Sequence, residues 1–247
     1  EEIHFYDDLF NITPRRVIDI CDEIDKRGLK VVWDYRGRVN GIDEESIKRF
    51  KNSGGRMISF GIETSSEEGL RVLRKGSKVK QNIEALRLCK KYGIVTIADF
   101  IIGLPHERSY DDVLKSIKTL TYDYRPDYAQ FSILSLYPNT KIYDQAVAKD
   151  LIKDGKWNKW ARDPLNVKLK VEHWHEYVSM EKLVELQKKA YRIFYFRPSA
   201  IWRQIKQIRS FYEVKVKIRG ALSVLAFDFG VFKKSKPLKP DYQVPIS

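Results

Sequence analysis

Polar residues recur at the ends of the apolar, strand-like runs of the sequence, where they could form one binding site. They are Asp7, Asp8, Arg38, Glu63 and Asp99. In parallel β/α folds the ligand binds where strands end and loops begin, so we expect these side chains on one rim. Carboxylates accept hydrogen bonds from hydroxyl and ammonium groups, and arginine clamps a carboxylate. The set predicts a site for a zwitterion and a ribose; the alternative is that Asp7, Asp8 and Glu63 only cap the following helices.

Two bends follow the later apolar runs. Gly103-Leu104-Pro105 comes after the fourth run, and Tyr137-Pro138-Asn139-Thr140 comes after the fifth. Glycine allows the ring of a ligand to approach the backbone closely. The sequence has no Walker A motif and no GxGxxG motif after a strand, which argues against a nucleotide triphosphate site.

The elements that must position these residues alternate between strand and helix over the first 150 residues. Thr13 and Asp43 are expected as N-caps, and Gly28 and Gly93 stand where helices must stop. Repeated β-then-α units produce parallel strands, in an open sheet or a barrel. The predicted strands are 2–6, 30–35, 57–62, 94–102 and 128–134, and the predicted helices between and after them are 14–27, 44–52, 67–73, 81–92, 110–121 and 141–151.

Composition and cysteine content narrow the class of protein. The 247 residues, 43% of them hydrophobic, are enough for one large α/β domain and an appendage. Apolar runs such as 94–104 are too short to span a bilayer, and no signal peptide opens the sequence, so we expect a cytoplasmic protein. Cys21 and Cys89 lie in separate helical segments and are expected to be core thiols, not metal ligands or a disulfide.

Five motifs resemble, in order and spacing, the radical S-adenosylmethionine (SAM) proteins. The similarity is closest to the cobalamin-dependent class that includes the anaerobic Mg-protoporphyrin monomethyl ester cyclases. It covers residues 1–150. The motifs are Phe5-Tyr6-Asp7-Asp8-Leu9-Phe10, Arg38 before Ile42-Asp43-Glu44-Glu45, Phe60-Gly61-Ile62-Glu63-Thr64, Ile101-Ile102-Gly103-Leu104-Pro105-His106-Glu107, and Tyr137-Pro138-Asn139-Thr140-Lys141-Ile142-Tyr143.

The resemblance implies a fold and a chemistry. Residues 1–150 would form a partial (β/α)6 TIM-like barrel of the α/β class that lacks its first βα unit, and residues 151–247 a basic, mostly helical C-terminal extension. SAM would bind beside a [4Fe-4S] cluster and yield a 5′-deoxyadenosyl radical for an iron–sulfur oxidoreductase, cyclase or methyltransferase, with cobalamin as a cofactor of the class. Family members act on tetrapyrroles, lipids and nucleic acids, so the substrate cannot be read from the sequence.

The resemblance also assigns positions around SAM. Asp7 and Asp8 would receive the methionine amino group, and Glu63 and Asp99 the ribose. Lys75, with the adjacent Arg74 as the alternative, would meet the methionine carboxylate.

The remaining expected SAM contacts come from the motif residues around the adenine. Ile101, Gly103 and Leu104 would form the adenine wall, and Arg38 and Tyr137 complete the set of cofactor-binding residues. The resemblance assigns no catalytic residue and no metal ligand within the chain.

Two motif positions depart from the family's pattern. His106 and Asn139 each replace a glycine. Asn tolerates positive φ well, and His106 is expected in a surface turn.

A larger departure is that Cys-x3-Cys-x2-Cys, the family's cluster motif, is absent. The sequence opens in mid-fold, so we expect the cluster motif to precede it, together with the first βα unit and a cobalamin domain. We also expect the chain alone to be inactive. The alternative is a degenerate relative.

The last third of the sequence carries almost all of the net charge of +13, since residues 151–247 hold 21 Lys and Arg against nine Asp and Glu. A basic surface suits nucleic acid, an anionic membrane surface or an acidic partner. A helix is predicted from Ser179, with a buried face formed by Leu183, Leu186, Ala190, Tyr191 and Phe194. Arg197-Pro198 would end this helix. In a second helix, one face would carry Arg203, Lys206 and Arg209 and another face Trp202, Ile205 and Ile208.

Two interpretations of this extension remain open. It could bind RNA through phosphate contacts and base stacking, as part of a catalytically inactive barrel or a scaffold. Alternatively, it could pack on the barrel as a helical lid with a solvated basic face, and this second interpretation is the one we favour. His173-Trp174-His175 is expected to be a turn with a packed Trp174, not a metal pair.

Overall fold

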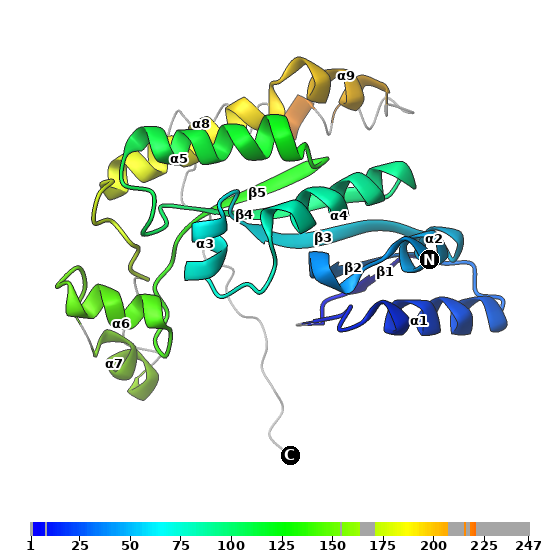
Figure 1. Cartoon of the computed structure of the whole chain (residues 1–247), viewed down its shortest axis with the longest axis horizontal. Coiled ribbons are helices and arrows are strands. Elements are labelled where there is room, and N and C mark those ends of the chain that lie inside the picture. The colour runs from blue at the N-terminus through cyan, green and yellow to red at the C-terminus, as the bar shows by residue number, and fades with distance from the viewer. Residues whose placement is uncertain are drawn as a thin grey trace, which may run out of the picture. The chain divides into compact units, whose positions relative to one another are not determined.

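Five parallel strands form one sheet in which the strands follow their order in the chain (Figure 1). The structure is a computed structural model that describes residues 2–7, 9–153, 155–163, 171–206, 215 and 218–220. The five predicted strands are confirmed, with ends within two residues of those expected. They are β1 (Glu2–Phe5), β2 (Val32–Gly37), β3 (Gly55–Glu63), β4 (Val95–Ile102) and β5 (Tyr128–Ile133).

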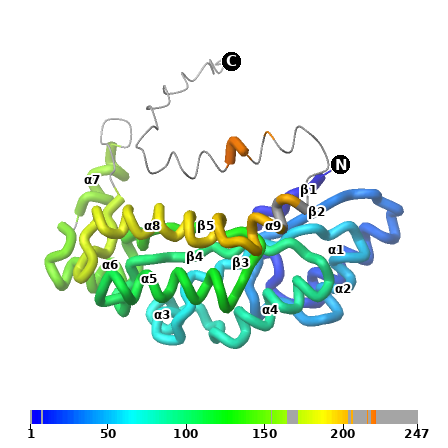
Figure 2. The backbone as a smooth tube through the Cα atoms, turned by 90° about the horizontal axis from the view of Figure 1, so that it is seen from above, coloured from blue at the N-terminus to red at the C-terminus, as the bar shows by residue number. Residues whose placement is uncertain are grey.

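Helices connect successive strands, as parallel pairing requires. Figure 2 shows them following one another around the sheet, from α1 and α2 to α5 and α6. The predicted helices are confirmed, and the fifth continues into a π-helical turn. The helices are α1 (Pro14–Lys26), α2 (Glu44–Asn52), α3 (Glu67–Val72), α4 (Val79–Lys91), α5 (Tyr110–Thr119), α6 (Lys141–Ala148), α7 (Lys156–Arg162), α8 (Met180–Tyr195) and α9 (Pro198–Lys206), with a 3₁₀ turn η1 (Val39–Gly41) and the π turn η2 (Leu120–Tyr124).

The predicted helix ends have the expected physical causes. The side chain of Thr13 accepts from the backbone of Arg16 at the start of α1, and Asp43 forms a capping box with Ser46 at the start of α2. Gly28 and Gly93 have φ of 61° and 64° just after α1 and α4. Both helices therefore end where only a left-handed residue allows the chain to turn away.

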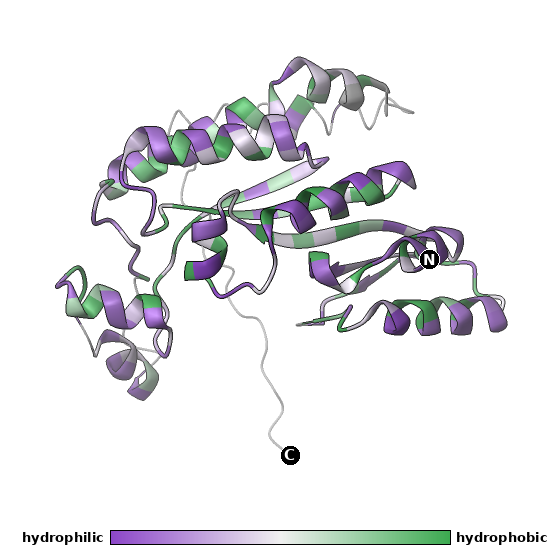
Figure 3. Ribbon diagram, viewed as in Figure 1, coloured by the Kyte–Doolittle hydropathy of each residue, from purple (hydrophilic) through white to green (hydrophobic). Residues whose placement is uncertain are grey.

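The two faces of the sheet differ because successive side chains of a strand point to opposite sides. Large aromatic and aliphatic residues on the outer face, such as Trp33, Tyr35 and Phe60, are fully buried under the helices. The Phe10 and Tyr35 rings stack with centroids 4.6 Å apart, and Trp33 meets Phe50 edge-on at 4.5 Å. Hydrophobic and hydrophilic bands alternate along the helices, as this one-sided burial requires (Figure 3).

Helix α8 packs against the outer face of β5. The ring of Phe131 meets Tyr191 and Phe194 edge-on, with centroids 5.3 and 6.0 Å apart. The Gln187 amide donates to the Phe131 carbonyl at 2.8 Å. The predicted buried face of this helix is confirmed, except that Tyr191 is only half-buried. The hydroxyl of Tyr191 accepts a hydrogen bond from the backbone N–H of Phe131.

Both cysteines are free and buried in the core, as expected. Burial raises the pKa of the Cys89 thiol to about 12 and also raises that of Cys21. Neither thiol is therefore a thiolate near neutral pH.

The chain divides into two compact units, Glu1–Phe194 and Tyr195–Ser247. The predicted break at Arg197-Pro198 is confirmed, because α8 ends at Tyr195 and α9 begins at Pro198. The predicted continuation of this second helix through Ile208 and Arg209 lies outside the described residues. Within the part of the chain that the structure describes, no helix is both long and apolar enough to cross a membrane.

Replacing Phe131 with Ala should destabilise the protein by about 3–5 kcal/mol, because it removes a fully buried ring from the contact between β5 and α8. Chemical denaturation would measure the free energy of unfolding. Tyr122→Ala, which truncates an exposed ring on η2, should change it by less than about 0.5 kcal/mol. Equal effects of the two substitutions would contradict the packing described for α8.

Candidate functional site

The carboxyl end of β3 holds an ion pair between two predicted site residues. The ammonium group of Lys75 lies 2.7 Å from a carboxylate oxygen of Glu63, and both side chains are largely buried. Glu63 has a φ of 62°, and the register between β3 and β4 shifts at this point. Arg74, the alternative to Lys75, is exposed and has a φ of 52° where it ends α3. The structure therefore brings Lys75, and not Arg74, onto Glu63.

Asp99 lies on the same face of the sheet as this ion pair. Gly61 is its register partner on β3, so side chains at these two positions would project to the same side. A Cβ atom on Gly61 would lie 2.6 Å from Glu63 Oε1 and 2.8 Å from Lys75 Nζ. The missing side chain thus leaves space that the Glu63–Lys75 pair uses, and the three predicted residues Glu63, Lys75 and Asp99 share one inner surface.

Two residues that the sequence did not single out, Ser59 and Arg36, contact Asp99. The hydroxyl of Ser59 donates to its carboxylate at 3.3 Å, and an Arg36 guanidinium nitrogen lies 3.9 Å away. The same guanidinium lies over the Tyr6 ring, 5.8 Å from its centroid. Arg36 and Ser59 are each next to an aromatic residue that is buried on the outer face of the sheet. Because neighbouring residues of a strand point to opposite faces, this alternation in the sequence predicts that Arg36 and Ser59 lie on the inner face.

The loops after β1 and β2 hold their predicted residues in other ways. Asp7 accepts a 2.8 Å ion-pair hydrogen bond from Arg16 and is half-exposed, whereas Asp8 lies outside the described residues. Arg38 is exposed, and its backbone is clasped by the buried amide of Asn11, which donates to the Arg38 carbonyl at 2.7 Å and accepts from its N–H at 2.8 Å. Asn11, which the sequence did not single out, thus ties the two loops together.

Glycines on either side of Arg38 make room for this clasp. A Cβ atom would lie 2.3 Å from the Asn11 side chain at Gly37 and 2.1 Å from its carbonyl at Gly41. The two glycines, spaced Gly-x3-Gly, are therefore the feature of the sequence that indicates a close contact with Asn11 at this loop.

The turn after β4 is held by Glu107. One carboxylate oxygen accepts from the backbone N–H groups of Gly103 at 2.7 Å and Leu104 at 2.9 Å. Burial raises the pKa of the Glu107 carboxyl and outweighs these hydrogen bonds, which act to lower it. Ile101 is half-buried and Leu104 is fully buried in an apolar cluster with Trp174. A ligand at this turn would therefore meet the Leu104 backbone and not its side chain.

His106 differs from its expected place. It does lie in the turn, but it is half-buried and both ring nitrogens are shielded from solvent, without a hydrogen-bond partner among the described residues. Its ring carbon would lie 2.6 Å from a Cβ atom on Gly69 of α3. The expectation of a surface position is wrong because the glycine leaves a hollow that the imidazole fills.

The residues after β5 pack against α7 and the segment around Trp174. Tyr137 is exposed, and its ring contacts Trp157 of α7 at 5.4 Å between centroids. His173 pairs with Ser135 across a β-bridge, and Trp174 is buried, as predicted for this segment. The ring of Tyr137 thus packs on α7.

One group of potential metal ligands occurs in the described residues, on the inner face at the amino ends of the strands. Ligand atoms of Glu2, His4 and Asp34 lie within 4.8 Å of one another. The guanidinium of Arg56, on β3, bonds Glu2 and lies 3.8 Å from Asp34. A cationic side chain therefore already neutralises these carboxylates, and the group acts as an ionic link between β1, β2 and β3.

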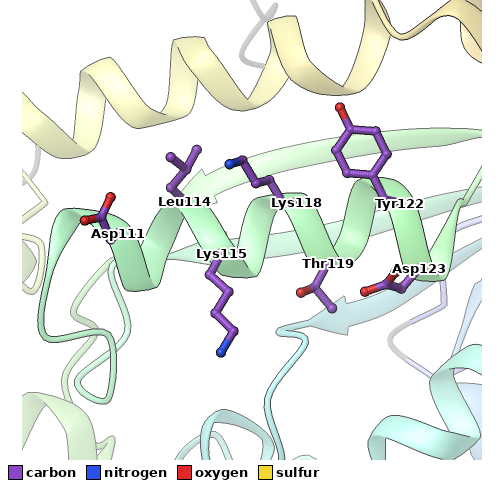
Figure 4. A pocket seen from close by; sticks show the side chains of 7 residues that line it. All are labelled: Asp111, Leu114, Lys115, Lys118, Thr119, Tyr122 and Asp123. Atoms are coloured by element: carbon purple, nitrogen blue, oxygen red, sulfur yellow. The ribbon is translucent and has the colours of Figure 1, made fainter.

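A shallow pocket on α5 and η2 offers no convergent site. Figure 4 shows that its lining side chains all project from this one helical stretch, some toward α8 and some away from it. Binding sites normally gather polar groups from several elements. The lining residues are Asp111, Leu114, Lys115, Lys118, Thr119, Tyr122 and Asp123.

The described residues do not fit an iron–sulfur cluster. Such a cluster needs several accessible thiolates close together. The chain contains two cysteines, and both are buried thiols on separate helices. No step of a reaction can be assigned through a cluster held by these residues.

Comparison with known proteins gives three findings. Residues 1–120 match the family model described as the radical SAM superfamily. The chain is 35% identical, over 91% of its length, to an uncharacterized methyltransferase of Pyrococcus horikoshii, and 31% identical over 53% to the anaerobic magnesium-protoporphyrin IX monomethyl ester cyclase of Rubrivivax gelatinosus. The solved structure of the cobalamin-dependent S-adenosylmethionine radical enzyme OxsB covers 92% of the chain with a TM-score of 0.57 and 16% identity, which shows a shared fold.

The chain spans only part of these relatives. It covers 47% of the Pyrococcus protein, 24% of the Rubrivivax cyclase and 39% of the OxsB chain. The shared fold supports the predicted α/β class, with parallel strands in the order expected of a partial barrel.

Glu107→Gln should remove a pH dependence of stability. Because the folded-state pKa is raised, the contribution of Glu107 is present below the ordinary carboxyl pKa of about 4.3 and is lost as pH rises through the folded-state pKa. Gln keeps an accepting oxygen but does not titrate, so the variant should gain stability relative to wild type as pH rises. Denaturation at a series of pH values would measure this, with the exposed Glu84→Gln as control; parallel profiles for wild type and Glu107→Gln would contradict it.

Proposed function

Because residues 1–120 match the radical SAM superfamily, we propose that the chain is the SAM-binding part of a radical SAM enzyme of the cobalamin-dependent, methyltransferase type. The inner surface formed by Glu63, Lys75 and Asp99 is the proposed binding site. The observation that carries this proposal is the Glu63–Lys75 ion pair beside Asp99, at the ends of two adjacent strands.

The donor and acceptor chemistry of this surface matches the parts of SAM. The carboxylates of Glu63 and Asp99 can each accept hydrogen bonds from ribose hydroxyl groups. The Lys75 ammonium can pair with the methionine carboxylate. The ends of the Glu63 and Lys75 side chains occupy the space that the missing side chain of Gly61 leaves, so both groups lie directly over the strands, where a ligand would meet them.

Binding of SAM would exchange one ion pair for others. Lys75 now neutralises Glu63 at 2.7 Å. When a carboxylate enters, the lysine can turn to it and release the Glu63 oxygens for the ribose hydroxyls. The half-buried setting strengthens these contacts relative to water, because the local dielectric is lower.

The turn after β4 would complete the proposed pocket. The hydrogen bonds that the Gly103 and Leu104 N–H groups donate to the Glu107 carboxylate fix the backbone there. Ile101 lies two residues after Asp99 on β4 and therefore on the same face of the sheet. An adenine ring placed on this turn would meet Ile101 and a rigid stretch of backbone. The roles of Asp7, Asp8, Arg38 and Tyr137 as further contacts remain proposals from the motif pattern.

Bound SAM would supply a methyl group or, after one-electron reduction by an iron–sulfur cluster that these residues do not hold, a 5′-deoxyadenosyl radical, while this chain's residues orient the ribose, the methionine and the adenine. The relatives include a methyltransferase and a tetrapyrrole cyclase, which supports a small-molecule substrate for the whole protein. The OxsB fold supports cobalamin as a second cofactor.

In the native full-length protein, Glu63→Ala or Asp99→Ala should weaken SAM binding by about 1–3 kcal/mol, the cost of losing a hydrogen bond to a charged group. Isothermal titration calorimetry would measure the dissociation constant. Glu68→Ala, at an exposed carboxylate on α3, is the matched control and should leave it unchanged. Unchanged SAM affinity in both site variants, with folding intact, would remove this surface from the binding site.

The chain as given should not assemble a stoichiometric [4Fe-4S] cluster, because its two thiols are buried on different helices and have raised pKa values. Anaerobic reconstitution followed by iron analysis and absorption spectroscopy would measure cluster content. The Cys21→Ser/Cys89→Ser variant should give the same background as wild type. A cluster that forms on wild type and disappears in this variant would show that the cysteines do bind iron.

A further inference from the structure

The two carboxylate oxygens of Asp99 have different surroundings. Oδ2 accepts a 3.3 Å hydrogen bond from the Ser59 hydroxyl and lies 3.9 Å from a guanidinium nitrogen of Arg36. Oδ1 has no hydrogen-bond or ion-pair partner among the residues that the structure describes, and it is not shielded from solvent. The protein therefore holds one oxygen, while the other can accept a hydrogen bond from a ligand.

Arg36 is placed beside this carboxylate by contacts with the first and third strands. It is the register partner of Ser59 on β3, so the two side chains start from the same face of the sheet. Its guanidinium lies over the ring of Tyr6, which follows β1, at 5.8 Å from the ring centroid. Such a cation–π contact restricts the guanidinium without using its N–H donors. These donors therefore remain available to Asp99.

The carboxylate of Glu63 shows the same division between its oxygens. Oε1 lies 2.7 Å from the Lys75 ammonium, whereas Oε2 has no such partner in the described part of the chain. The two cations differ in what they can do when SAM binds. Lys75 would turn to the methionine carboxylate and leave Glu63 without its counter-ion. Arg36 rests on an aromatic ring, so it would stay at Asp99 and limit the repulsion between the two carboxylates.

We propose that Arg36 is a positioning residue of the candidate SAM site: together with Ser59 it holds Oδ2 of Asp99, so that Oδ1 faces the ligand and accepts a hydrogen bond from a ribose hydroxyl. Arg36 acts through Asp99 and does not need to touch SAM itself. This inference rests on the proposed function, because Arg36 has this role only if Asp99 contacts SAM. The alternative is that Arg36 is only an ionic link between strands, which would affect the stability of the protein but not its affinity for SAM.

Isothermal titration calorimetry of SAM with the native full-length protein tests the proposal. Arg36→Gln should weaken SAM binding by about threefold, within the range that a partly exposed ion pair contributes. Arg36→Lys keeps the positive charge and should retain most of the affinity. Loss of a cation would by itself favour SAM, whose sulfonium gives it a net positive charge, so weaker binding identifies the local role. The matched control Arg87→Gln removes an exposed arginine that lies 3.6 Å from Glu84 and should leave the affinity unchanged.

A double-mutant cycle shows whether Arg36 acts through Asp99. Asp99→Asn keeps an accepting oxygen but removes the charge with which Arg36 pairs. We expect Arg36→Gln to cause no further loss of SAM affinity in the Asp99→Asn background, because the effects of residues in contact are not additive. An arginine that acts independently of Asp99 would weaken binding equally in both backgrounds. Ser59→Ala removes the other contact to Oδ2 and should also weaken SAM binding by about threefold.

Two results would overturn this inference and leave the SAM site in place: unchanged affinity in Arg36→Gln although Asp99→Ala weakens binding, or an equal loss from Arg36→Gln in both backgrounds. Unchanged affinity in Asp99→Ala would also overturn the role of Arg36 and, if Glu63→Ala has no effect either, the proposed site itself. A loss in Arg36→Gln that disappears in the Asp99→Asn background would support the inference. Circular dichroism of each variant checks that it is folded.

Discussion

The left-handed backbone at Glu63 is the constraint on which the candidate site depends. A glutamate with a φ of 62° is strained by about 1–3 kcal/mol, and such strain persists only where the surroundings enforce it. Here the register shift beside Gly61 and the ion pair to Lys75 hold it. Lys75 is itself positioned by a second left-handed residue, Arg74, and by a hydrogen bond from its own N–H to the Leu70 carbonyl that closes the end of α3. Two non-glycine residues in the left-handed region thus bring opposite charges together above β3.

The alternation of apolar, strand-like runs with amphipathic helical segments was enough to predict the strands and helices of the sheet. Parallel strands with buried outer faces need alternating side chains, and the apolar runs, the cap at Asp43 and the glycine after α4 mark the element ends. The pairing of Glu63 with Lys75 could not be foreseen, because it depends on two left-handed residues that are not glycines. The burial of the Leu104 side chain was equally hidden, since it arises from packing on Trp174, seventy residues along the chain.

Helix α8 links the packing of the sheet to the candidate site. It binds the outer face of β5 through Phe131, and its Leu183 contacts the turn after β4, where a Cβ atom on Gly103 would lie 3.0 Å from it. Gly103 has a φ of 77°, so both its backbone conformation and this contact require glycine. The sequence predicted that this helix would pack as a lid, but its contact with the adenine-wall turn follows only from the fold. Changes in α8 should therefore reach the site through Gly103.

Hydrogen exchange with and without SAM tests the central claim most directly, because it locates the bound ligand on the backbone. Measured by mass spectrometry on the native protein, saturating SAM should slow exchange in peptides that contain residues 61–64 and 99–104, at the carboxyl ends of β3 and β4. Peptides from α1 and α6 should not change. Slowed exchange confined to other parts of the protein, with SAM shown to be bound, would contradict the assignment of this inner surface as the SAM site.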